Sequence, residues 1–125
     1  MQTHEVEFIM TFFHNLKLGK KTGDYTAVER LIAPDARLLT AKGERRGAKE
    51  VLEYLKEMEK QRYHMEIVAP KGGLVTVLVA PVSYEGQPIG RGREQVYRLL
   101  DEKLIELIDI GRTPQQVNRP DSQPN

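Results

Sequence analysis

Residues 93–110 read REQVYRLLDEKLIELIDI, and this stretch decides the fold of the chain. Apolar side chains alternate with polar ones on both sides of Asp101 and Glu102, which is typical of two half-buried β-strands joined by a tight connection. Residues 89–100 and 104–110 are therefore predicted to form two strands that pair antiparallel.

The register of this hairpin decides which polar side chains share the interior with Asp109, which the alternation turns inward in either register. A connection that loops out residues 101–103 gives three inner pairs: Leu99 with Ile105, Tyr97 with Leu107, and Gln95 with Asp109. A two-residue turn instead brings Glu94 and Arg98 to the inner face. We favour the first register, because Arg98 is better solvated on the outside.

Working outward from the hairpin, helical periodicity comes first in the chain and strand periodicity follows. We expect a helix that ends near Gly19, a short helix between Asp24 and Pro34, and a third helix after Gly47. The predicted extended segments are a strand over 36–41, a polar turn over 42–47, and strands over 63–69 and 74–84. This order predicts one α+β domain over residues 1–112, followed by a flexible tail over 113–125.

The strand that begins at Leu74 is apolar on both faces. One face carries Val75, Val77 and Val79, and the other carries Leu74, Leu78 and Ala80. The helices of a chain this short can cover only one face of the sheet, so a homodimer through the outer sheet face is expected. An interpretation as an assembly protein alone would make the valine face the functional surface.

Composition and charge exclude several classes of function. The 125 residues include no cysteine, which excludes disulfides, thiolate nucleophiles and cysteine-bearing metal sites. The net charge is +1 with acidic and basic residues interleaved, so no nucleic-acid partner is expected. No segment resembles a signal peptide or a membrane span, which predicts a cytoplasmic protein without a membrane partner. The three histidines lack metal-ligand spacing, so no metal is expected.

Several phrases resemble a known family. They are GDYTAVERLIAPDARL (residues 23–38), RGAKEVLEYL (residues 46–55) and the hairpin sequence itself. Together with the order of elements, they resemble the nuclear transport factor 2-like superfamily over about residues 5–112, and within it the SnoaL-like polyketide cyclase group. The resemblance implies a cone, in which a curved antiparallel sheet wraps around N-terminal helices and encloses a pocket for a small-molecule ligand.

The resemblance also implies roles for two hairpin residues. An aromatic side chain is expected on the inner face at Tyr97, which agrees with the favoured register. Asp109 matches the aspartate that ends the last strand in SnoaL-like cyclases and limonene-type epoxide hydrolases. The chain departs from the epoxide hydrolases, whose central strand carries an Arg-x-Asp pair where residues 74–76 stand here. It departs from ketosteroid isomerases at Thr40 and Gln95, where those enzymes carry acidic residues.

Asp109 is the candidate catalytic residue. Among apolar side chains the charged form of a carboxylate is disfavoured, which suits proton transfer near neutral pH. The alternative is a structural aspartate at a strand end, paired with Arg112 or solvated. The candidate substrate-binding residues are Gln95, Tyr97, Tyr54, Phe12, Phe13, His14 and Leu107.

Two functional hypotheses follow. The first is a cofactor-independent isomerase, cyclase, lyase or hydrolase that uses Asp109 as general acid or base on a mostly apolar substrate. The second is a non-catalytic dimeric module that binds a ligand or serves as an accessory or assembly protein with the same fold. The first hypothesis predicts a closed pocket of several hundred cubic ångströms with Asp109 at its floor.

Overall fold

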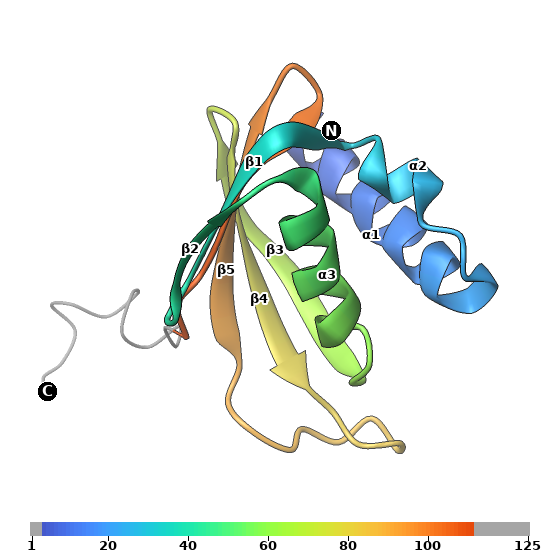
Figure 1. Ribbon diagram of the computed structural model, residues 1–125. Helices are drawn as coiled ribbons and strands as arrows, with labels where there is room; N and C mark the ends of the chain where they lie inside the picture. Colours follow the sequence, from blue (N-terminus) through green and yellow to red (C-terminus); the bar gives the residue numbers. More distant parts are fainter. Residues whose placement is uncertain (1–3, 112–125) are drawn as a thin grey trace, which may run out of the picture.

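The computed structural model describes residues 4–111, in which three helices lie on one face of a curved six-stranded sheet (Figure 1). The helices are α1 (His4–Thr22), α2 (Thr26–Glu29) and α3 (Ala48–Met58). The strands are β1 (Ile32–Thr40), β2 (Gly43–Arg46), β3 (Tyr63–Lys71), β4 (Leu74–Pro81), β5 (Arg93–Leu100) and β6 (Lys103–Asp109). No helix in this described part is long and apolar enough to cross a membrane. The predicted tail, residues 113–125, lies outside the described residues.

The sheet has the strand order β2-β1-β6-β5-β4-β3. Neighbouring strands pair antiparallel except β1 and β6, which run parallel. The predicted α+β architecture is therefore confirmed, whereas the sheet is mixed rather than wholly antiparallel. The sequence reading identified hairpins between consecutive strands, but the parallel pairing joins strands far apart in the chain, and local alternation carries no signal for it.

The prediction of a polar turn over residues 42–47 is wrong in its middle. Gly43–Arg46 form the edge strand β2, in which every residue is exposed. Because such a strand buries neither face, its sequence does not show the alternation of a half-buried strand. Strand β1 also begins earlier than predicted, because Pro34 and Asp35 lie within an irregular part of this strand and do not end it.

The connection between β5 and β6 is shorter than the favoured register assumes. Only Asp101 and Glu102 lie between the strands, and both have positive φ, 53° and 60°. Two consecutive left-handed residues are typical of a type I′ turn, whose twist matches that of the flanking strands. The prediction that residues 101–103 loop out is therefore wrong. The sequence did not indicate a two-residue turn, because Asp-Glu lacks the glycine that usually marks it.

The inner face of the hairpin nevertheless agrees in part with the favoured register. A β-bulge adds Ile105 to strand β6. As a result, Leu99 lies opposite Leu104 and not opposite Ile105 as predicted, whereas Tyr97 lies opposite Leu107 as predicted. The bulge therefore reconciles a two-residue turn with an inward-facing Tyr97.

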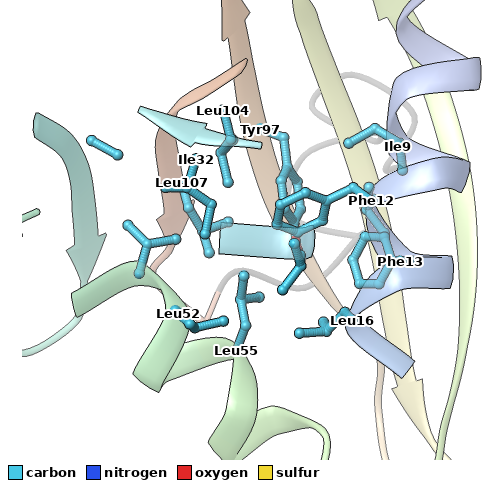
Figure 2. Close-up of a cluster of buried hydrophobic side chains, with 14 of the residues drawn as sticks. Ile9, Phe12, Phe13, Leu16, Ile32, Leu52, Leu55, Tyr97, Leu104 and Leu107 are labelled. Carbon is cyan, nitrogen blue, oxygen red and sulfur yellow. The ribbon is translucent and has the colours of Figure 1, made fainter. Parts of the chain in front are cut away.

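Side chains from α1 and α3 fill the deep part of the concave side (Figure 2). Phe12 and Phe13 of α1 contact Tyr97 edge to face, with ring centroids 6.3 and 5.7 Å away. Leu55 of α3 and Leu107 of β6 are fully buried in the same cluster. This region is a close-packed core held by aromatic contacts and apolar burial, so the deepest part of the cone is filled.

The valine face of β4 belongs to this core. Val75, Val77 and Val79 are buried beneath the helices, while Thr76 and Leu78 alternate onto the outer face and are half-buried. The interpretation that makes the valines an assembly surface is therefore wrong, because the helices already cover them. Only the Thr76 side of the strand is available to a partner.

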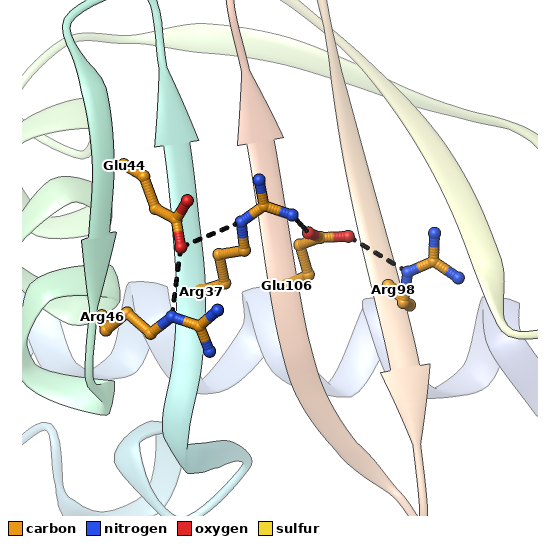
Figure 3. A network of polar contacts seen from close by, with 5 residues as sticks. All are labelled: Arg37, Glu44, Arg46, Arg98 and Glu106. Carbon is orange, nitrogen blue, oxygen red and sulfur yellow. Dashed lines mark hydrogen bonds and ion pairs between the residues drawn. The ribbon is translucent and has the colours of Figure 1, made fainter.

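The outer face carries a row of charged side chains across β2, β1, β6 and β5 (Figure 3). Glu106 accepts hydrogen bonds from Arg37 at 2.6 Å and from Arg98 at 3.1 Å. Glu44 accepts one from Arg46 at 3.1 Å and lies 3.2 Å from Nε of Arg37. Positive and negative side chains therefore alternate across these four strands, which include the parallel pair β1 and β6.

The two faces of β4 predict opposite results for the same substitution. Val77→Glu buries a carboxylate among apolar side chains, and we expect it to lower the free energy of unfolding by about 3 kcal/mol or more. Thr76→Glu, one residue away on the outer face, should leave the fold intact. Urea denaturation followed by circular dichroism measures both. Equal stability of the two variants would contradict the assignment of the faces.

Candidate functional site

Asp109 ends β6 with its side chain only 1% exposed, and its carboxylate accepts four hydrogen bonds. Nε of Arg93 lies 3.1 Å from Oδ1 and 3.0 Å from Oδ2. The hydroxyl of Tyr54 donates to Oδ2 at 2.6 Å, and the amide of Gln95 donates to Oδ2 at 3.0 Å. We call Asp109, Arg93, Tyr54 and Gln95 the carboxylate cluster.

Secondary structure explains how these four residues meet. The alternation of β5 puts Arg93, Gln95 and Tyr97 on its inner face, next to the inner face of β6. Tyr54 lies on the side of α3 that packs against the sheet, three residues after buried Val51 and four before Met58, which packs against the core. The hydroxyl of Tyr97 donates to Oε1 of Gln95 at 2.6 Å, so hydrogen bonds extend from the core to the carboxylate cluster.

The surroundings of Asp109 differ from the expected apolar walls. Its burial agrees with the alternation of β6, but donors from β5 and α3 surround the carboxylate. A buried carboxylate is retained when it is paired and hydrogen-bonded. The partner is Arg93; Arg112, the partner considered in the structural alternative, lies outside the described residues.

The protonation states of the neighbours follow from the same contacts. Burial, and then the hydrogen bond to Asp109, raise the pKa of Tyr54 well above its ordinary value. Burial opposes the charge of Arg93, but the carboxylate of Asp109 outweighs it and raises the pKa of Arg93. Burial likewise raises the pKa of Tyr97. At neutral pH the cluster therefore combines a cationic guanidinium with one neutral phenol, and Tyr97 behind Gln95 is also neutral.

A pocket of about 440 Å³ opens beside the cluster, between the β1–β2 hairpin, α3 and the end of β6. Its lining residues are Leu38, Thr40, Ala41, Lys42, Arg45, Tyr54, Glu57, Arg93, Asp109 and Gly111. We call it the β1–α3 pocket. Its lining is mostly apolar, with the carboxylate cluster supplying a polar wall. The pocket is open to solvent, in contrast to the closed pocket that was expected.

The candidate site residues fall into three places. Asp109 and Tyr54 line the β1–α3 pocket, and Gln95 lies behind Asp109, fully buried. The side chains in the packed core, away from the pocket lining, are Tyr97, Phe12, Phe13 and Leu107. His14 lies exposed on α1 and does not line the pocket. The structure therefore brings two of the seven candidate substrate-binding residues, Tyr54 and Gln95, together with Asp109, and it places the other five elsewhere.

Sequence reasoning missed Arg93 and the β1–β2 residues of the lining. The signal for Arg93 was present, because it has the same parity as Gln95 on β5, and a cation on an inner face requires an acidic partner. Lys42 and Arg45 were not identifiable in this way. They reach the pocket because β2 folds back along β1, and the sequence did not predict that pairing.

The raised pKa of Tyr54 predicts how stability depends on pH. Above about pH 10, the ordinary pKa of tyrosine, the unfolded chain loses a proton from this residue that the folded chain keeps. The free energy of unfolding therefore falls as the pH rises, by up to about 1.4 kcal/mol per pH unit for this group. In Tyr54→Phe the decline between pH 10 and 11.5 should be shallower, as measured by urea unfolding at a series of pH values. Identical slopes for the two proteins would contradict the prediction.

Comparisons with known proteins place the fold. No protein-family model matches the chain, and no curated protein matches it in sequence. Its structure is similar to that of an NTF2-like protein of unknown function from Cytophaga hutchinsonii, with TM-score 0.59, 15% identity, and coverage of 86% of this chain and 89% of the other.

Two further structures agree. An NTF2-like protein of unknown function from Mesorhizobium loti matches with TM-score 0.60 and 13% identity, covering 83% of this chain and 87% of its own. A de novo designed protein with a curved β-sheet matches with TM-score 0.65 and 18% identity, covering 88% of each chain. Similarity at these identities shows the fold alone. The chain has the nuclear transport factor 2-like fold, as its sequence resemblance implies.

Proposed function

We propose that the chain binds a small organic molecule in the β1–α3 pocket. The observation that carries the proposal is the convergence of Asp109, Arg93 and Tyr54 on one wall of a mostly apolar pocket. A volume of about 440 Å³ lies within the range of small-molecule sites, which combine apolar walls with a few fixed polar groups. The pocket supplies both parts.

Within this proposal, Asp109 is a positioning residue. Its carboxylate accepts hydrogen bonds from three side chains, which fixes Arg93 and Tyr54 where they line the pocket. Fixed donors lose little entropy when a ligand binds, and they therefore contribute more to affinity than mobile ones. The ligand would contact the guanidinium and the phenol, with Asp109 behind them.

Proton transfer by Asp109 is the second candidate function. It is supported by the presence of the carboxylate in the pocket lining. A general base needs a free oxygen within reach of the substrate, however, and both oxygens of Asp109 already accept hydrogen bonds. Catalysis as a SnoaL-like isomerase, cyclase, lyase or hydrolase would require Arg93 or Tyr54 to release one of them. That group membership and a cytoplasmic location stay predictions.

Filling the pocket tests ligand binding directly. In a fragment screen by ¹H–¹⁵N NMR, we expect hits that shift the backbone signals of Thr40, Ala41 and Gly111. Ala41→Trp should weaken these hits about tenfold or more, because the indole occupies the pocket. Ala27→Trp, at an exposed position of α2, is the matched control and should bind as the parent chain does. A screen whose hits shift none of these three signals would contradict the proposed function.

The outer face supports a second proposal, a homodimer formed by two copies of this chain. A partly exposed row of three apolar side chains and one threonine, which we call the apolar row, crosses four strands in register: Leu39, Ile108, Val96 and Thr76. Beside it runs the charged row of Figure 3, in which positive and negative side chains alternate. A second copy related by a two-fold axis can cover the apolar row and offer opposite charges to the charged row.

The dimer is tested at the centre of the apolar row. Val96→Glu places one unpaired carboxylate per copy in the proposed interface, and we expect dissociation to become about a hundredfold more favourable. His64→Glu adds the same charge at an exposed position on edge strand β3 and should leave the dimer intact. Light scattering after size exclusion measures both masses. A monomeric parent chain, or a dimer that withstands Val96→Glu, would refute this interface.

A further inference from the structure

The charged residues around the β1–α3 pocket are not balanced. Three cationic side chains line it, Lys42, Arg45 and Arg93, and two acidic ones, Glu57 and Asp109. Asp109 is already engaged, since it binds Arg93. Glu57 lies 2.6 Å from Lys60, outside the lining, in an ion pair whose two side chains are largely exposed. The cationic side chains of the lining therefore outnumber the acidic ones by one.

The cations differ in how far they are engaged. Arg45 lies 3.4 Å from Glu50, in an exposed ion pair of the kind that contributes little. Lys42 is exposed at the β1–β2 turn, and no acidic side chain among residues 4–111 lies within ion-pair distance of it. The positive charge that the pocket does not compensate internally therefore lies at its rim, on Lys42.

Arg93 adds a cation at the inner wall. Both of its hydrogen bonds to Asp109 leave from Nε, so Asp109 does not use the two terminal nitrogens of the guanidinium. The side chain is 34% exposed and lines the pocket. Arg93 also hydrogen-bonds to Tyr54, the other polar side chain of this wall. A planar guanidinium whose terminal donors Asp109 leaves unused matches the geometry of carboxylate and phosphate oxygens.

Between the rim and the inner wall the lining is apolar. This surface is supplied by Leu38 on the inner face of β1, by Ala41 in the β1–β2 turn, and by the ring of Tyr54 on α3. A ligand that satisfies the whole pocket therefore needs an apolar body and a negatively charged oxygen group. Neutral polar molecules leave the charge of Lys42 without a partner, and small inorganic anions leave the apolar surface uncovered.

We propose that the ligand of the β1–α3 pocket is an organic anion, with a carboxylate or phosphate group directed to Arg93 and Lys42 and an apolar body against Leu38 and Ala41. The inference rests on the proposed function, because it names the chemical class of that ligand. Carboxylate and phosphate share the recognised chemistry, a compact group of anionic oxygens.

Three probes of equal chain length separate charge from apolar contact: octanoate, octyl phosphate and octanamide. Binding is followed by NMR titration of the backbone signals of Thr40, Ala41 and Gly111 at low salt. We expect at least one anionic probe to bind about tenfold more tightly than octanamide. Its affinity should fall as salt is added, while that of octanamide stays constant. The preferred anion identifies carboxylate or phosphate as the group recognised.

Lys42→Gln assigns the effect to the pocket rim. We expect it to weaken the preferred anion about three- to fivefold and to leave octanamide unchanged. The matched control, Lys21→Gln, removes an exposed lysine at the end of α1, outside the pocket lining, and should change neither affinity.

The possible outcomes distinguish failure of the anionic ligand class from failure of ligand binding itself. Octanamide or neutral fragments from the screen could bind in the pocket as tightly as the anions. In that case the proposed anionic class of ligand is wrong, while the proposal that the pocket binds a ligand is retained. If anions bind but Lys42→Gln and Lys21→Gln lose equal affinity, the preference comes from overall charge and the inference fails. If no probe and no fragment shifts the pocket signals, both proposals fail.

Discussion

The buried carboxylate of Asp109 is the contact on which the site depends. It receives donors from α3 and β5 at the end of β6, so one side chain links three elements. Removing the negative charge would leave Arg93 partly buried without its counterion, which is costly in a low-dielectric environment. The carboxylate cluster therefore links α3 to the sheet and also forms the polar wall of the pocket.

The concave side of the sheet is divided by depth. Toward α1, the rings of Phe12, Phe13 and Tyr97 fill the space completely. Toward the β1–β2 hairpin, the β1–α3 pocket remains between β1, α3 and the end of β6. Hydrogen bonds through Gln95 connect the two regions, from the hydroxyl of Tyr97 to the carboxylate of Asp109. The packed core thereby holds the side chains that line the pocket in fixed positions. A preformed binding site requires this arrangement.

Sequence reasoning succeeded where a residue's role depends on local periodicity. The α+β order follows from periodicity along the chain, and the inward position of Asp109 follows from alternation along one strand. The pairing of Tyr97 with Leu107 also required a choice of register, which rested on the solvation of Arg98 and on the family resemblance. It failed where the decisive contact joins distant segments. The parallel pairing of β1 with β6 and the edge strand β2 have no local signature, and together they bring Lys42 and Arg45 to the pocket. Phe12 and Phe13 were predicted to line the pocket but lie in the packed core. Periodicity identifies the inner face of a helix, but it does not show whether that face lines a cavity or packs against another side chain.

The two edges of the open sheet have a consequence for how copies of this chain can meet. Edge strand β2 is short and exposed and carries Glu44, Arg45 and Arg46, while edge strand β3 ends in an irregular segment in which Pro70 lacks a backbone donor. Short length, charge, proline and irregular pairing are the devices that prevent a strand from continuing into a neighbouring chain. Growth into an extended sheet by addition of strands is thus disfavoured at both edges. Copies of this chain are therefore expected to associate through the faces of the sheet rather than through its edge strands.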